Sequence, residues 1–125
     1  MNDAIRTALA RGGIIDLTTT GRRSGEPRRI EIVFHVIDGR IVVSGMPRRE
    51  KRAWLANIEA NPRVTVHLKR DVVADLPGEA RVVTDESERR ALLGHVARAW
   101  RRDDLEVMVR YSPLIEIVLD DRAIA

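Results

Sequence analysis

From Arg28 onward the chain alternates between apolar and polar side chains, and this period of two constrains the fold more than any other feature. One face of the segment carries Ile30, Ile32, Phe34 and Val36. Such alternation is typical of a β-strand with one buried face. Asp38-Gly39 follows directly and is a strong signal for a two-residue hairpin turn. We therefore expect an antiparallel hairpin whose returning strand covers residues 41–44.

Four further segments have the composition of strands. They are rich in β-branched residues or alternate in polarity, which favours extended structure. They cover residues 14–20, 64–68, 72–84 and 114–119. Within the third, Leu76-Pro77-Gly78 predicts an interruption, because proline and glycine weaken a strand.

Three segments have helical patterns, at residues 2–11 within a possible N-terminal helical stretch 1–12, at 51–60 and at 85–100. The last begins with a capping-box pattern, Asp85 followed by Glu88. Its apolar stripe includes Leu92, Leu93, Val96 and Trp100. A stripe so apolar should not face water, so we expect this helix to cover one opening of a barrel.

These elements predict an α+β fold with a mostly antiparallel sheet, because hairpins dominate the order of strands. So many short strands in 125 residues must close, or nearly close, to hide their edges. We expect a single domain over residues 1–125, a β-barrel with peripheral helices.

Composition excludes several kinds of site. The chain has no cysteine, which rules out disulfides, thiolate zinc sites and cysteine nucleophiles. The three histidines, His35, His67 and His95, lack the spacing of metal ligands, so no metal site is expected. No apolar run approaches the ~20 residues that span a bilayer. We therefore expect a cytoplasmic protein with no integral membrane segment.

The turn at residues 18–29 is the most informative segment for function. It holds four arginines, Arg22, Arg23, Arg28 and Arg29, together with Ser24 and Gly25. Guanidinium groups, a hydroxyl and outward-pointing amides would suit phosphate or carboxylate oxygens. A solvated basic hairpin tip explains the same residues equally well. The turn lacks the GK[ST] ending of a phosphate-binding Walker loop.

Aromatic residues are few, namely Phe34, Trp54, Trp100 and Tyr111. Single-stranded nucleic acid is usually held by several stacking aromatics beside a basic groove, so we expect no nucleic-acid partner. Trp54 follows the charged loop Arg48-Arg49-Glu50-Lys51-Arg52 and is either a core residue or the wall of a ligand pocket.

Two motifs together resemble the deazaflavin-dependent nitroreductase family. The first is TTTGRRSGEPR at residues 18–28, and the second is WLANIEANPRVTV at residues 54–66. The resemblance covers roughly residues 14–120. It implies a split β-barrel like that of pyridoxamine-phosphate oxidases, and it implies binding of the deazaflavin coenzyme F-420, which carries a phosphate and an oligoglutamate tail.

The resemblance also implies roles for individual residues. Donors to the phosphate and tail would be Arg22, Arg23, Ser24 and Arg28, with Gly25 permitting the turn. Ser44 and Gly45 match the segment that passes the deazaflavin ring, and Trp54 and Asn57 match the helix that closes the site. Gly45 stands where close nitroreductase relatives have a lysine, and Glu31-Ile32 stands where they have a Pro-Leu pair.

The expected function is therefore hydride transfer from reduced F-420 to a small-molecule substrate, an unsaturated or nitro-type organic acceptor. Ser44 and Tyr111 are the candidate catalytic donors. Two alternatives stay open at this point. One is an FMN-binding oxidoreductase on the same fold, and the other is a non-catalytic module for an anionic ligand such as a fatty acid or a tetrapyrrole. The assembly is also open, with a homodimer as one option.

Overall fold

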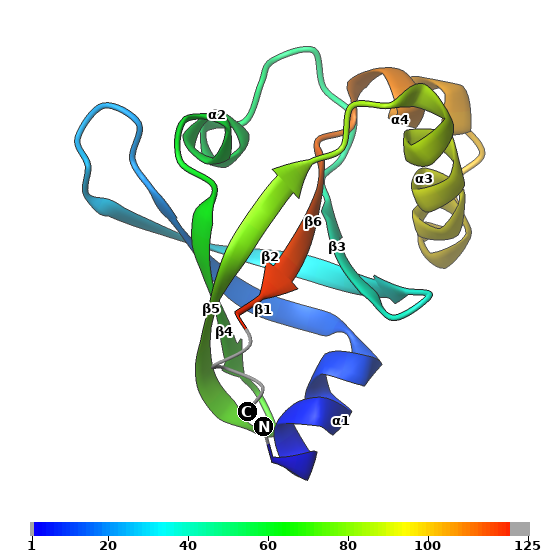
Figure 1. The fold of residues 1–125 in the computed structure, drawn as a ribbon. Coiled ribbons are helices and arrows are strands. Elements are labelled where there is room, and N and C mark those ends of the chain that lie inside the picture. The colour runs from blue at the N-terminus through cyan, green and yellow to red at the C-terminus, as the bar shows by residue number, and fades with distance from the viewer. Residues whose placement is uncertain (1, 121–125) are drawn as a thin grey trace.

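The structure, a computed structural model, describes residues 2–120. Within that range six antiparallel strands close a barrel in the order β1-β2-β3-β6-β5-β4, accompanied by four helices (Figure 1). The strands are β1 (Gly13–Thr20), β2 (Pro27–Ile37), β3 (Arg40–Ser44), β4 (Arg63–Lys69), β5 (Val73–Val82) and β6 (Leu114–Leu119). The helices are α1 (Asp3–Arg11), α2 (Ala53–Ala60), α3 (Glu86–Trp100) and α4 (Leu105–Tyr111). This architecture confirms the predicted α+β class and the closed antiparallel barrel.

The β2–β3 hairpin forms as the sequence predicts. Ile37 pairs with Arg40 across the turn. Asp38 and Gly39 both have positive φ, at 51° and 77°. A tight hairpin turn of this kind needs two such residues, and Asp-Gly supplies them at low steric cost.

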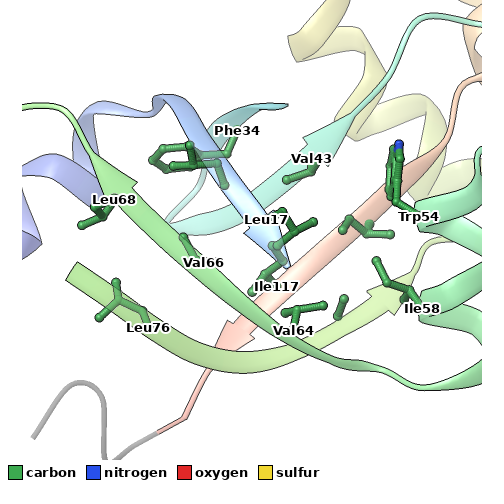
Figure 2. Packing of buried hydrophobic residues seen from close by; sticks show 13 residues of the cluster. Leu17, Phe34, Val43, Trp54, Ile58, Val64, Val66, Leu68, Leu76 and Ile117 are labelled. Carbon is green, nitrogen blue, oxygen red and sulfur yellow. The ribbon is translucent and has the colours of Figure 1, made fainter. Parts of the chain in front are cut away.

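The barrel interior is a continuous apolar core (Figure 2). Its buried members from the strands are Ile15, Leu17, Phe34, Val43, Val64, Val66, Leu68, Leu76, Ala80, Ile115 and Ile117. They alternate along each strand with residues that face outward, as the period of two requires.

Two short helices close the ends of this interior. Trp54 and Ile58 of α2 join the core at one end, and both side chains extend from the helix towards the strands in Figure 2. At the opposite end α1 packs Ile5, Ala8 and Leu9 against the same cluster (Figure 1). The Trp54 side chain is therefore a core residue as well as a neighbour of the charged loop before it.

Helix α3 does not cover a barrel opening, so that expectation is wrong. It lies with α4 beside β3 and β6, against the outside of the barrel (Figure 1). Its buried residues Leu92, Leu93 and Val96 form a second cluster with Val42 and Leu114. These two strand residues are adjacent to inward-facing Val43 and Ile115, so they point outward and need cover. Trp100 is only partly buried there and packs at the edge.

Strand β5 is continuous, so the interruption expected at Leu76-Pro77-Gly78 is also wrong. Pro77 pairs with Thr65 of β4 without breaking the ladder. Its carbonyl accepts the Asp120 amide at 3.0 Å, so its hydrogen-bonding side faces β6 just beyond Leu119. The missing N–H of proline therefore falls where no strand bond is required.

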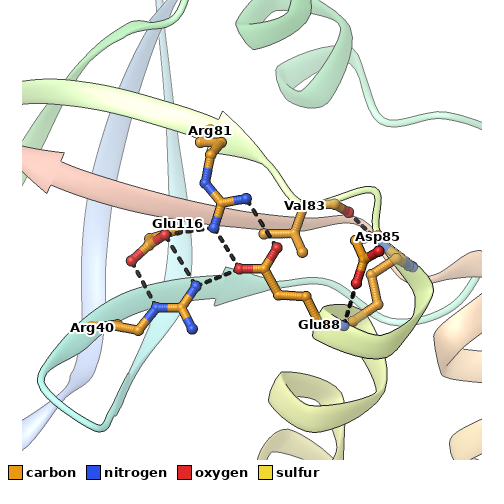
Figure 3. A network of polar contacts seen from close by, with 7 residues as sticks. Arg40, Arg81, Val83, Asp85, Glu88 and Glu116 are labelled. Atoms are coloured by element: carbon orange, nitrogen blue, oxygen red, sulfur yellow. Dashed lines mark hydrogen bonds and ion pairs between the residues drawn. The ribbon is translucent and has the colours of Figure 1, made fainter.

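Four alternating charges hold α3 to the barrel (Figure 3). Glu88 of α3 accepts hydrogen bonds from Arg40 at 2.7 Å and from Arg81 at 2.6 Å. Both arginines also bind Glu116 of β6, Arg40 at 2.8 Å. Only half of the predicted capping box forms, because the Asp85 carboxylate accepts the Glu88 amide at 2.9 Å while the Glu88 side chain turns to the arginines.

No helix in residues 2–120 is long and apolar enough to cross a membrane. The expected single domain over residues 1–125 stays a prediction, since residue 1 and residues 121–125 lie outside the described part of the chain.

Candidate functional site

The arginine turn joins β1 to β2 and is closed by its own backbone. The Gly21 amide donates to the Glu26 carbonyl, and the Gly25 amide donates to the Gly21 carbonyl, both at 2.8 Å. Gly25 has a φ of 72°, which glycine adopts without strain. The expectation that amides here point outward is therefore wrong for these two residues. The ligand donors of the turn must come mainly from side chains.

Asn57 fixes the turn to helix α2. Its amide nitrogen donates to the Thr19 hydroxyl at 3.1 Å, and its carbonyl oxygen accepts the Arg22 backbone amide at 3.0 Å. Asn57 and Thr19 are both buried. The Asn57 side chain is thus a positioning group for the turn, which the sequence did not reveal.

Ser24 keeps a donor available. Its hydroxyl oxygen accepts two hydrogen bonds, from the Glu26 amide at 3.1 Å and from the Arg28 guanidinium at 3.2 Å. A hydroxyl has one donor and two acceptor positions. With both acceptor positions used, its hydrogen is left to donate to a ligand.

The turn carries positive charge that no carboxylate within residues 2–120 neutralises. Arg22, Arg23 and Arg28 form no ion pair with any residue in the described range 2–120. The fourth arginine differs, because Arg29 binds Asp16 at 2.9 Å. Three exposed guanidinium groups therefore share one short segment.

These residues line a cavity of about 320 Å³, called here the turn cavity. It is bounded by Thr19, Gly21, Arg22, Arg23, Ser24, Arg28, Arg29, Ile30, Ala53, Trp54 and Asn57. The structure thus brings together the predicted turn residues Arg22, Arg23, Ser24 and Arg28 with Trp54 and Asn57 of α2. The cavity combines an apolar wall with guanidinium groups at its edge.

A second cavity of about 320 Å³ is called here the arginine cavity. Residues at the start of α2 line both cavities, with Arg52 and Leu55 at the arginine cavity and Ala53 and Trp54 at the turn cavity. The arginine cavity also takes in Arg48, Arg49, Arg110 and Tyr111. Burial and the neighbouring charge of Arg48 lower the pKa of the Arg52 guanidinium, which Glu50 offsets in part.

Ser44, Gly45 and Tyr111 lie on the side of the arginine cavity. Ser44 is buried, and its hydroxyl donates to the Gly45 carbonyl at 3.2 Å. Neither Ser44 nor Gly45 lines either cavity, whereas Tyr111 lines the arginine cavity. The Tyr111 ring stacks with the guanidinium of Arg110, whose central carbon is 5.4 Å from the ring centroid.

A side chain at Gly45 would force its neighbours to move. A Cβ there would lie 2.8 Å from Pro113 Cγ and 3.3 Å from an Arg52 guanidinium nitrogen. Arg52 is held in place by a hydrogen bond to the Met46 carbonyl. A guanidinium from the following loop therefore supplies positive charge beside the position where the nitroreductase pattern has lysine.

Glu31 is the other residue that differs from the nitroreductase pattern, and its carboxylate is paired outside both cavities. Its carboxylate binds Lys69, at 2.5 Å, and Lys69 also binds Asp16, at 2.6 Å. The hydrogen bonds from Lys69 and Arg29 lower the pKa of the Asp16 carboxyl. The Glu31 charge is thus paired with a lysine rather than facing the turn cavity.

One polar constellation was not predicted. The Thr18 hydroxyl lies 2.7 Å from His67 Nε2, and His67 Nδ1 lies 2.6 Å from the Asp75 carboxylate. The His67 hydrogen bond lowers the pKa of the Asp75 carboxyl. Although the order hydroxyl, imidazole, carboxylate is that of a hydrolytic triad, none of the three lines either cavity, so this group links β1, β4 and β5 across the outer face.

Comparison with known proteins gives one family and a consistent set of folds. The sequence model of the family described as F420H(2)-dependent quinone reductase matches residues 2–118. An F-420-H2-dependent reductase superposes with a TM-score of 0.64 at 23% identity, over 85% of this chain and 94% of that one.

Two further solved structures are similar at lower identity. One is an F-420 reductase, with a TM-score of 0.71 at 17% identity over 96% of both chains. The other is a pyridoxamine 5′-phosphate oxidase-like protein from Listeria innocua, with a TM-score of 0.71 at 17% identity over 94% of this chain and 92% of that one. These likenesses establish the barrel fold.

Proposed function

The chain belongs to the F420H(2)-dependent quinone reductase family and is an F-420-dependent oxidoreductase, and from this premise we propose how its own residues serve the reaction. Coenzyme F-420, rather than FMN, is the cofactor of the family, and a non-catalytic module no longer describes the chain. We propose that the arginine turn holds the phosphate-bearing, anionic part of the coenzyme and that the acceptor is a quinone or a similarly unsaturated molecule.

The observation that carries this proposal is the uncompensated charge of the turn. Arg22, Arg23 and Arg28 repel one another and have no carboxylate partner in the described range. An anion among them would relieve that repulsion and accept charge-assisted hydrogen bonds. The free O–H of Ser24 and the Trp54 wall of the turn cavity suit a ligand that is anionic at one end and aromatic at the other.

When bound, the reduced coenzyme supplies the hydride, and the protein supplies binding, orientation and electrostatics. Asn57 keeps the turn against α2, so that the guanidinium groups are already assembled before a ligand arrives. Preorganised donors of this kind lower the cost of ordering on binding. Trp54 and Ile58 keep water out of the barrel end beneath the site.

Of the two expected proton donors, Tyr111 suits the task better than Ser44. Tyr111 is partly exposed and lines a cavity, while the Ser44 hydroxyl is buried and bound to the Gly45 carbonyl. Replacing Tyr111→Phe should therefore lower kcat with little change in coenzyme affinity. Unchanged turnover in this variant would remove Tyr111 from the chemistry.

A binding titration tests the turn directly. We expect the protein to bind F-420 at low micromolar concentration and to bind FMN far more weakly. Losing one charge-assisted hydrogen bond, in Arg23→Gln or Arg28→Gln, should weaken F-420 binding by ~10- to 100-fold. The matched control is Arg98→Gln, at an exposed arginine of α3 that forms no ion pair within residues 2–120.

The outcomes separate the parts of the proposal. If both turn variants bind F-420 as tightly as the native protein does, F-420 remains the cofactor but the proposed role of the turn is refuted. High salt should weaken binding by the native protein more than by the variants, because screening acts on the charges that they lack.

The location, assembly and partners of the protein are proposals of a different kind. A cytoplasmic location, a homodimer and the lack of a nucleic-acid partner all stay predictions. Fractionation of cells, light scattering and a filter-binding assay with DNA and RNA would test them in turn. Sub-micromolar binding to either nucleic acid at physiological salt would contradict the last.

A further inference from the structure

We propose that the arginine cavity is the acceptor site and that it selects acceptors carrying a carboxylate. This inference rests on the function proposed above, because it assumes that the turn cavity takes the anionic part of the coenzyme. It adds a property of the acceptor, a carboxylate, that the family description does not specify.

The charge of the arginine cavity is the first support. Arg48, Arg49 and Arg110 are exposed and form no ion pair within residues 2–120. Lys51, which also lines the cavity, is already paired with Glu59 at 2.7 Å. Glu50 is the one acidic residue among the lining residues. An excess of guanidinium groups is thus left facing a concave surface.

The wall of the cavity is the second support. Leu55, Val82 and Pro113 contribute apolar surface, and Tyr111 adds an aromatic ring. Small-molecule sites typically combine such a wall with a few placed polar groups and measure ~300–1,000 Å³. At about 320 Å³ the cavity lies at the small end of that range. It suits a single-ring acceptor with one short anionic substituent.

The reaction balances without a further reagent. Reduced F-420 loses a hydride and a proton and becomes the oxidised coenzyme, while a quinone gains a hydride and a proton and becomes a hydroquinone. The carboxylate of the acceptor takes no part in this exchange. It serves only to hold the ring against the apolar wall through Arg48, Arg49 and Arg110.

A matched pair of acceptors tests the inference. We would compare 1,4-benzoquinone acetic acid with its methyl ester, which differ by one negative charge. The native protein should show at least a tenfold higher kcat/KM for the acid. In the double variant Arg48→Gln/Arg110→Gln the ratio should fall to near one, because kcat/KM for the acid falls while kcat/KM for the ester stays unchanged. Arg98→Gln serves as the control and should retain the native ratio.

Each other result overturns the inference. A native ratio near one, or variants that slow acid and ester alike, would show that charge selection is absent. Variants that weaken F-420 binding instead would assign the arginine cavity to the coenzyme, while the proposed function would stand.

Calorimetry without coenzyme keeps the test independent of turnover. If neither quinone is reduced and F-420 does not bind, the proposed function fails, and the cavity is judged by binding alone. The acid should then bind at least tenfold more tightly than the ester and lose this advantage in Arg48→Gln/Arg110→Gln. Equal binding of acid and ester would refute the anion site by itself.

Discussion

Asn57 shows how one side chain can shape a site through its hydrogen bonds. Its amide group satisfies a hydroxyl of β1 through a buried bond and a backbone amide of the turn through a partly buried one. The resemblance to nitroreductases placed Asn57 in the cofactor site, and the structure gives it a more specific task. It holds the start of the arginine turn against α2, so the turn cavity depends on it for shape.

Replacing Asn57→Ala should therefore have two effects. The Thr19 hydroxyl and the Arg22 amide would lose their partners, which should lower the free energy of unfolding by about 1–3 kcal/mol. F-420 affinity should fall as well, although every arginine remains. Denaturant unfolding and a coenzyme titration measure the two effects.

The control is Asn61→Ala, which removes an exposed hydrogen bond to the Arg63 amide at 3.0 Å. It should cost less stability and leave coenzyme binding unchanged. A fully stable Asn57→Ala protein with native affinity would show that the turn holds its shape unaided.

At the level of elements, alternation and caps predicted most strands and helices, but they could not say what each apolar face packs against. The stripe on α3 is apolar, which predicts burial, yet an outer barrel face and a barrel opening would both bury it. The prediction of a break at Pro77 was wrong for a related reason. A proline destabilises a strand only where a neighbouring strand would need a hydrogen bond from that position. Both errors concern tertiary context, which local pattern does not contain.

In the candidate site, too, one part follows from local sequence and the other depends on tertiary context. The arginine turn was visible because its arginines are close in sequence. The arginine cavity was only hinted at by the loop before Trp54, because its other members, Arg110 and Ser112, come from a distant segment.

Glu88 carries the docking of α3, and its charge should make that docking sensitive to acid. Hydrogen bonds from Arg81 and then Arg40 lower the pKa of Glu88 to about 2. A carboxyl whose pKa is lower in the folded state adds stability above its unfolded pKa of about 4.5 and loses it as pH falls towards 2. Glu88→Gln should therefore cost about 1 kcal/mol at neutral pH and little at pH 2.

Unfolding curves of both proteins between pH 2 and 7 measure this difference. Glu86→Gln, at an exposed position of the same helix, is the matched control. Its effect on the free energy of unfolding should vary less with pH. A Glu88→Gln penalty that stays constant through this range would mean that shape, and not charge, holds α3 in place.

At the scale of the whole molecule, the barrel has one interior with a helix at each end and a second core outside it. This division places the two tryptophans in different roles. Trp54 is 9% exposed and belongs to the interior cluster. Trp100 is partly buried at the edge of the outer cluster, beside His35, with ring centroids 5.4 Å apart.

Truncating the two tryptophans should therefore give unequal losses. Trp54→Ala should lower the free energy of unfolding by about 3–5 kcal/mol, the usual cost of emptying an aromatic site in a core. Trp100→Ala should cost clearly less, because part of its ring already faces solvent. Shifts in the denaturant midpoint at an unchanged m-value would measure both changes in the free energy of unfolding. Equal losses of stability in the two variants would contradict the assignment of the tryptophans to different clusters.

The place of β6 in the barrel has a consequence for the order in which the chain can fold. It follows every other described strand in sequence, yet it lies between β3 and β5. The earlier strands can form two hairpin units, β1 to β3 and β4 to β5, from neighbours along the chain. Each unit keeps an open edge until β6 arrives, and pairing between such distant segments is slow, typically milliseconds to seconds. A folding intermediate would thus present two unprotected strand edges that other copies can extend. Refolding yield should consequently fall with protein concentration even though the closed barrel leaves no edge for association.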